Sequence, residues 1–205
     1  MPRPPDLSPR KTPRQRRSRQ MVERIVEATT RVLTEHGYDG ASTNRIAAEA
    51  GISSGSLYQY FPNKDAIVVA VLDRFADDLA DHVGARLEAV MAEPWQAAGR
   101  ALLDTQIELF EENAELLRII VERVPRLGSV DKLDALRRRM SDLVRMYVIL
   151  NRERFRADLD VETAVWILAE TTGLLSARYV LDRPRIPRER MVDELTALVT
   201  RYIER

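Results

Sequence analysis

Cysteine is absent from the 205 residues of this sequence, and histidine occurs only twice, as His36 and His82. Without cysteine the chain can form no disulfide bond, and it has no thiol nucleophile and no cysteine ligand for zinc. Two histidines far apart in the sequence do not form the clusters of metal ligands, or the pairs of nucleophile and base, on which most metal-dependent and hydrolytic enzymes depend. We therefore predict a protein that is not an enzyme and that needs no metal and no cofactor.

Long apolar runs are missing as well. The longest covers residues 66–72 and is enclosed by Asp65 and Asp73, whereas a membrane-spanning helix needs about 20 apolar residues. The N-terminal residues carry proline and arginine in place of the apolar core of a secretory signal. We expect a cytoplasmic protein with no membrane partner.

Glycine and proline are scarce after residue 64, with four of each in the remaining residues. No segment there alternates apolar and polar residues, as a half-buried strand would. Apolar residues instead recur every three or four positions, which is typical of helices. We predict an all-α fold of about nine helices. The residues expected to cap helix N-termini are Thr43, Ser53 or Ser54, Asn63, Ser129 and Asp160.

Basic and acidic residues are equal in number over the whole chain, but they are unevenly distributed. Residues 1–64 contain 11 basic and 6 acidic residues, and the rest of the chain contains 21 and 26. Half of the prolines and seven basic residues lie within the first 20 positions, beside the single acid Asp6. We predict a disordered basic arm over residues 1–18 that attracts a polyanion, attached to an acidic body.

A three-helix pattern fills residues 19–63. Apolar residues recur at helical spacing from residue 19 to Gly37, which we expect to end the first helix. Two short helices are predicted at residues 44–50 and 54–61, with Gly51 between them. Two short helices joined by a turn that contains glycine are typical of a helix-turn-helix.

The second short helix carries small polar and aromatic residues beside an apolar face. Leu57 and Phe61 are four residues apart and predict the inward face. A recognition helix enters the major groove with small or polar residues at its N-terminus, where they can approach bases and phosphates. Taken singly, residues such as Thr43 and Lys64 are better explained as caps or ordinary surface residues, since capping is their commoner role. The candidate DNA-binding residues are Thr43, Asn44, Arg45, Ser54, Gly55, Ser56, Tyr58, Tyr60 and Lys64.

Several of these residues belong to a longer pattern. Its positions are Thr43, Ile46, Ala47, Ala50, Gly51, Ile52, Ser53, Gly55, Leu57, Tyr58, Tyr60, Phe61 and Lys64, preceded by residues 25–28 and 32–38. This stretch resembles the DNA-binding domain of the TetR/AcrR family of bacterial transcriptional regulators. The rest of the chain is similar to that family only in length and helical texture.

The resemblance implies a role for each matching residue. Phosphate contacts are implied for Thr43, Tyr58 and Lys64. Base or groove contacts are implied for Ser54, Gly55, Ser56 and Tyr60. The resemblance also implies that residues 19–63 form the DNA-binding domain and that residues 64–205 form a helical domain for ligand binding and dimerisation.

The last two expected helices offer surfaces for a second copy of the chain. Small residues recur four apart on the first of them, and the second carries two apolar lines. The alternative is a monomer core that buries both lines. A two-fold dimer would place two recognition helices on successive major grooves. The candidate interface residues are Ala169, Gly173, Ala177, Met191, Leu195, Leu198 and Tyr202.

Polar residues interrupt the apolar faces of the acidic body. Such groups either satisfy one another within a core or line a cavity. The candidate pocket residues, with one aromatic wall, are Gln106, Phe110, Tyr147, Trp166 and Glu170.

Together these features predict a homodimeric, ligand-responsive transcriptional repressor of a pseudo-palindromic DNA operator. A small molecule, not identified by the sequence, would weaken DNA binding by preferring a different arrangement of the recognition helices. Three alternatives stay open. They are an activator or a regulator without a ligand, a helical enzyme with a DNA-binding appendage, and a sequence-independent architectural DNA protein.

Overall fold

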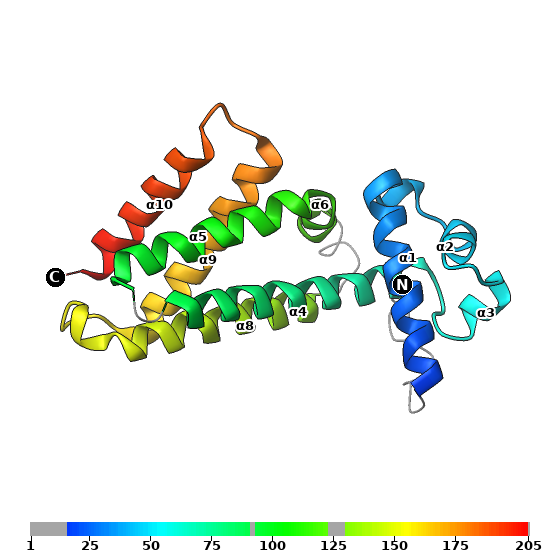
Figure 1. Cartoon of the computed structure of the whole chain (residues 1–205), viewed down its shortest axis with the longest axis horizontal. Helices are drawn as coiled ribbons and strands as arrows, with labels where there is room; N and C mark the ends of the chain where they lie inside the picture. The colour runs from blue at the N-terminus through cyan, green and yellow to red at the C-terminus, as the bar shows by residue number, and fades with distance from the viewer. Residues whose placement is uncertain (1–15, 91–92, 123–129, 205) are drawn as a thin grey trace, which may run out of the picture. The chain divides into compact units, whose positions relative to one another are not determined.

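The computed structural model of the chain describes residues 16–90, 93–122 and 130–204. Regular structure in these ranges consists of nine α-helices and one 3-10 turn without any strand, so the predicted all-α fold is confirmed (Figure 1). None of the described helices is apolar over enough length to cross a bilayer. The elements are α1 (Arg16–Gly40), α2 (Thr43–Glu49), α3 (Ser54–Tyr58), α4 (Lys64–Val90), α5 (Trp95–Glu112), α6 (Ala114–Glu122), α8 (Val130–Leu150), η1 (Arg152–Arg154), α9 (Val161–Asp182) and α10 (Arg188–Ile203).

Contacts between residues group the chain into two compact units. The first unit comprises Met1–Ala76 and Glu115–Leu133, and the second comprises Asp77–Ala114 and Asp134–Arg205. The division falls inside α4, whereas the sequence pattern places the domain boundary between residues 63 and 64. The first part of α4 groups with the helix-turn-helix, and its residues Ile67 and Val68 are fully buried.

The first unit has a small apolar core beneath its short helices. Ile25 of α1, Ile46 of α2, Leu57 of α3 and Phe61 just beyond α3 have no exposed surface. The inward faces predicted from the residue spacing are therefore confirmed. Burial of each such side chain stabilises the fold by about 1.5–3 kcal/mol relative to exposure, so this core fixes how α3 is presented.

Ser42, and not Thr43, caps α2. The Ser42 backbone is extended (φ −134°, ψ 155°), and its Oγ accepts a hydrogen bond from the amide of Arg45 at 3.2 Å. The expectation that Thr43 is the cap is wrong by one residue, because Ser42 already satisfies this free amide. Thr43 is instead the first helical residue, and its hydroxyl is available to another partner.

Three other predicted caps are confirmed. Ser53 Oγ accepts a hydrogen bond from the backbone amide of Ser56 at 3.1 Å. Asn63 Oδ1 accepts from the amide of Ala66, and Asp160 Oδ1 accepts from the amide of Thr163, both at 2.8 Å. The hydrogen bonds from Thr163 hold the pKa of the Asp160 carboxyl below its usual value. The remaining candidate, Ser129, lies outside the described residues.

Gly37 interrupts the regular geometry of α1. Its φ is 65° and its ψ is 177°, a conformation that side chains with a Cβ rarely adopt. The first helix therefore kinks at the predicted position. It does not end there as expected, because helical residues continue to Gly40.

The second unit is built on α5, α9 and α10. Ile107 of α5, Val180 of α9 and Val192 of α10 are buried. The turn η1 is followed by Phe155, which is fully buried in an apolar cluster with Val148 of α8. These contacts give the unit a core of its own, separate from that of the first unit.

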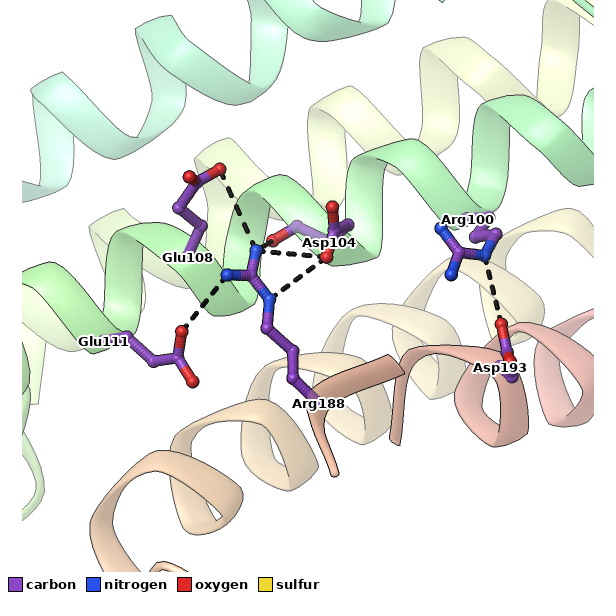
Figure 2. A network of polar contacts seen from close by, with 6 residues as sticks. All are labelled: Arg100, Asp104, Glu108, Glu111, Arg188 and Asp193. Carbon is purple, nitrogen blue, oxygen red and sulfur yellow. Dashed lines mark hydrogen bonds and ion pairs between the residues drawn. The ribbon is translucent and has the colours of Figure 1, made fainter. Parts of the chain in front are cut away.

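Arg188, the first residue of α10, ties α10 to three carboxylates of α5 (Figure 2). Its Nε donates to Asp104 Oδ1 and its Nη2 to the Asp104 backbone oxygen, both at 3.1 Å. The guanidinium also lies 3.3 Å from Glu111 Oε2 and 3.9 Å from Glu108 Oε2. One arginine thus neutralises part of an acidic line on α5 and holds the start of α10 in place.

Two further polar contacts extend this α5–α10 seam. Arg100 Nε donates to Asp193 Oδ1 at 3.0 Å, as Figure 2 shows, and Gln96 Nε2 donates to Glu204 Oε1 at 2.9 Å. The seam therefore joins α10 to α5 from its first residue to the residue that follows its last turn.

Candidate nucleic-acid interface

Two hydrogen-bonded pairs of side chains join the start of α2 to α3. The hydroxyl of Thr43 lies 3.0 Å from the hydroxyl of Tyr58. Ser54 Oγ donates to Asn44 Oδ1 at 2.9 Å. All four residues are candidate DNA-binding residues of the sequence, and the two helices bring them to one surface.

The apolar face of α3 holds this surface in position. Leu57 and Phe61 are fully buried, whereas Tyr58, the next residue along the helix, is 42% exposed. Successive residues of a helix point about 100° apart, so anchoring Leu57 in the core turns Tyr58 outward. The aromatic ring and hydroxyl of Tyr58 are thereby presented on the surface without loss of the core contact.

Gly55 occupies an exposed position that the fold does not reserve for glycine. Its φ is not positive, and a Cβ there would meet only Ser53 Oγ, at an ordinary 3.8 Å. Glycine within a helix costs about 1 kcal/mol relative to alanine. No contact within the chain requires glycine at this position in spite of its cost to the helix. Close approach of another molecule to the backbone would explain it.

Ser56 and Tyr60 complete the candidate set on α3 and just beyond it, and both are half-buried, as Thr43, Ser54 and Lys64 are. Ser56 Oγ lies 2.9 Å from Ser53 Oγ, so its hydroxyl is engaged with the cap of α3. Tyr60 is half-buried beside Phe61 in the sequence. Both lie on the same short segment as Ser54 and Tyr58.

The two candidate cations, Arg45 and Lys64, are held by the end of α1. Arg45 Nη1 donates to the backbone oxygen of Gly40 at 2.5 Å. Lys64 Nζ donates to the backbone oxygen of Tyr38 at 2.9 Å and lies 3.9 Å from the centre of the Tyr38 ring. An ammonium has three hydrogens, so Lys64 can still donate to a further acceptor.

The predicted basic arm falls largely on residues outside the described ranges. The prediction of a disordered arm is wrong for residues 16–18, because α1 begins at Arg16 and these residues are helical. The local reason is that no proline follows Pro13 in this stretch and arginine is a good helix former. Any arm is therefore shorter than the sequence pattern indicates, and basic residues of α1 continue it.

Arg24 is a basic residue near the helix-turn-helix that the sequence pattern does not single out. It is exposed on α1, and a Cβ added at Gly51 would lie 2.6 Å from its Nη2. That guanidinium is the flexible end of an exposed side chain and can move aside, so it is the φ of 63° at Gly51 that makes the turn between α2 and α3 favour glycine. The signal that could have identified Arg24 is an arginine at an outward position of α1, between the apolar positions that are buried.

The candidate dimer residues do not share one exposed face. Leu198 is 50% exposed, and a Cβ at Gly173 would meet no atom within 4 Å. Ala177 and Leu195 are already buried within the chain, so the prediction that they contact a second copy is corrected. The three remaining candidates, Ala169, Met191 and Tyr202, are half-buried.

Large apolar side chains that the interface prediction omits are exposed on α9. Leu174 is 61% exposed and Trp166, which the sequence assigns to a pocket, is 65% exposed. Both lie on the helix that carries Gly173. Exposed apolar residues of this size commonly mark interaction surfaces.

None of the candidate pocket residues lines a cavity that lies beside Glu111. Phe110 is buried, Gln106 and Glu170 are half-buried, and Tyr147 packs against the cluster around Phe155. Burial raises the pKa of the Tyr147 hydroxyl above its usual value. This cavity, of about 290 Å³, lies elsewhere in the second unit. It is lined by Glu111, Ala114, Tyr179, Val180, Arg183 and Pro184.

Comparison with known proteins identifies both parts of the chain. Residues 25–71 match the family described as bacterial regulatory proteins, tetR family, and residues 94–203 match the tetracyclin repressor-like C-terminal domain. The HTH-type transcriptional repressor KstR2 of Mycolicibacterium smegmatis is 26% identical over 193 residues, which cover 92% of each chain.

Two further similar proteins differ in how much of the chain they share. The fatty acid metabolism regulator protein of Bacillus subtilis is 30% identical over 111 residues, 48% of this chain and 57% of that protein. The solved structure of the fatty acid degradation regulator FadR from Bacillus halodurans has a TM-score of 0.71 at 19% identity. It covers 87% of this chain and 93% of that chain, so the two share a fold.

Proposed function

This chain belongs to the TetR family of bacterial regulatory proteins, and from that premise we propose a specific way in which it represses transcription. It binds a pseudo-palindromic operator as a homodimer and leaves the operator when a small molecule binds its C-terminal helices. The observation that carries the proposal is the surface made by Thr43, Asn44, Ser54 and Tyr58, which two hydrogen bonds assemble over a buried apolar anchor.

In the proposed complex, α3 enters the major groove. Ser54 and Gly55 lie at its N-terminal end, where small residues let the backbone approach the base edges. Tyr58, together with Thr43, donates a hydrogen bond to a phosphate, and Lys64 neutralises a phosphate at the start of α4. Such phosphate contacts fix the register of α3, and the groove contacts supply the sequence preference.

The dimer is proposed on the outer faces of α9 and α10. The exposed Trp166, Leu174 and Leu198 supply apolar area, and the open space at Gly173 permits close approach of a second helix. A single recognition helix binds weakly, whereas a two-fold dimer reads two half-sites about 34–36 Å apart. A regulator of bacterial genes acts where the DNA lies, so we place it in the cytoplasm.

The effector is proposed to act by linkage. A ligand that prefers the conformation with misplaced recognition helices weakens DNA binding by the difference between its affinities for the two states, commonly about 1–3 kcal/mol. Two of the three similar proteins named above are regulators of fatty acid metabolism or degradation, so fatty acids are the first compounds to test. No cofactor is proposed, and the family supports a regulator in place of an enzyme.

Selection from a random duplex pool tests the proposal. The full chain is mixed with the pool at about 150 mM salt, because protein–DNA specificity depends on salt. We expect an inverted repeat to be enriched, and we expect Tyr58→Ala to abolish the enrichment. Uniform binding that disappears with added salt would contradict the proposal.

A further inference from the structure

We propose that Asn44 and Ser54 act as one unit in which Ser54 can only accept a hydrogen bond from DNA. This unit selects, at one position of each half-site, a base that presents an exocyclic amine in the major groove, adenine or cytosine. The inference rests on the proposed function and specifies the chemistry that its recognition surface reads.

The geometry defines which atom carries which role. Ser54, the first residue of α3, donates its hydroxyl hydrogen to Asn44 Oδ1 across 2.9 Å. Asn44 is the second residue of α2 and is exposed, and Ser54 is half-buried. The two side chains therefore meet from separate helices, ten residues apart in the chain.

A hydrogen-bond inventory then limits what each group can offer. A serine hydroxyl has one hydrogen and two acceptor positions. Because the hydrogen of Ser54 is taken by Asn44, its Oγ can only accept. The Asn44 amide nitrogen retains two hydrogens and can only donate.

The adjacent hydroxyls leave this arrangement undisturbed. Ser53 Oγ and Ser56 Oγ are 2.9 Å apart and are engaged with each other. Ser53 Oγ also accepts from the Ser56 amide as the cap of α3. Thr43 is paired with Tyr58. Asn44 is thus the partner that sets the direction of the Ser54 hydroxyl.

The major groove provides a matching code. Adenine N6 and cytosine N4 are donors there, whereas guanine presents O6 and N7 and thymine presents O4, all acceptors. An acceptor-only Ser54 is satisfied by adenine or cytosine on the contacted strand. Against guanine or thymine its lone pairs face other lone pairs. We expect a preference of about 5- to 10-fold, the value of one well-placed hydrogen bond.

Asn44 controls this preference, so its substitution has a distinctive result. Asn44→Ala releases the hydrogen of Ser54, which can then donate to guanine O6 or thymine O4. The discrimination between amine-bearing and amine-lacking bases should fall to within about twofold. Ser54→Ala should also lose it, because no acceptor remains. Ser141→Ala, the same chemical change on α8 in the second unit, should keep the full profile.

The test uses the full-length protein and the operator obtained by selection. Each base of a half-site is replaced in turn, and adenine or cytosine is also replaced by purine or 2-pyrimidinone, which lack the exocyclic amine. Binding is measured by fluorescence anisotropy. The expected result is one position at which the wild-type protein loses 5- to 10-fold on removal of the amine, while Ser54→Ala and Asn44→Ala do not.

The outcomes separate this inference from the proposed function. If the wild-type protein binds its operator specifically but both variants keep the wild-type profile at every position, the inference is overturned and the repressor stands. If the wild-type protein shows no sequence preference, the proposed function fails. Circular dichroism of each variant checks folding. Should Ser54→Ala fail to fold, the profile of Asn44→Ala alone decides the inference.

Discussion

The hydroxyl groups of Tyr58 and Thr43 lie 3.0 Å apart, so a hydrogen bond links α3 to the first residue of α2. Two hydroxyls hold two hydrogens, and their mutual bond uses one of them. The pair can therefore donate one hydrogen bond onward, from whichever oxygen retains its hydrogen. In the proposed complex a phosphate receives that bond.

Removal of either hydroxyl should weaken DNA binding, because in each case the Thr43–Tyr58 pair loses the hydrogen bond that it donates to the phosphate. We expect Tyr58→Phe and Thr43→Val each to lower affinity by about 3- to 10-fold for all duplexes, because phosphate contacts carry no sequence information. The double variant should bind only slightly less well than either single variant. Anisotropy at a fixed salt concentration measures all three. Tyr179→Phe, whose hydroxyl donates to the Ile186 oxygen in the second unit, serves as the control. Additive losses would contradict a shared contact.

Deletion of residues 1–15 should reduce both affinity and its salt dependence. This segment contains Arg3, Arg10, Lys11 and Arg14, and the deletion leaves α1 intact. Each phosphate neutralised by a basic residue contributes about 0.9 to the slope of log K against log salt. We expect the slope to fall by about 1–4 per chain. The measurement is a salt titration of operator binding, and an equal slope before and after deletion would show that the segment makes no phosphate contact.

Gly173→Leu should disrupt the proposed dimer without unfolding the chain. A Cβ at Gly173 meets no atom within 4 Å, and the same holds for Gly99 on α5. Leucine is a better helix former than glycine by about 0.5–1 kcal/mol, so neither substitution should unfold the chain, and circular dichroism checks this. Sedimentation velocity should show more monomer for Gly173→Leu and an unchanged dimer for Gly99→Leu. Identical behaviour of both variants would place the dimer surface elsewhere.

Arg188→Ala should destabilise the second unit. The substitution removes bonds from α10 to Asp104 and Glu111 and leaves three acidic side chains of α5 without their shared cation. The Arg188 side chain is 33% exposed, so solvent screening moderates the loss. We expect about 1 kcal/mol by urea unfolding at unchanged slope. Arg190→Ala, which breaks an exposed pair with Glu194 in the same turn of α10, should cost less than about 0.5 kcal/mol.

The sequence predicts the helix-turn-helix well because local patterns determine it. Leu57 and Phe61 lie where their four-residue spacing places them, and Ser53 and Asn63 cap the helices they precede. The error at Thr43 has a local cause too. Ser42 and Thr43 are both competent caps, and spacing alone does not distinguish adjacent residues.

The packing of the second unit is less predictable from the sequence, because its helices are apolar on several sides. On α9, Ala177 is buried and Leu174 is exposed, although the two are only three residues apart. Which side faces inward depends on how α9 packs against α5, and spacing does not contain that information. The cavity beside Glu111 is equally absent from the pattern, since it depends on where α5 and the end of α9 meet.

The turn between α2 and α3 also constrains how this surface can evolve. A side chain at Gly51 would push aside only the guanidinium end of the exposed Arg24 side chain, but it must also adopt a φ of 63°. Substitution of Arg24 by a shorter residue would remove the first obstacle but not the second, which costs about 1 kcal/mol or more. The effect of a mutation at position 51 is thus set mainly by the backbone conformation and depends little on the residue at position 24. Drift at this turn is therefore restricted to glycine or to the few residues, such as asparagine, that tolerate a positive φ.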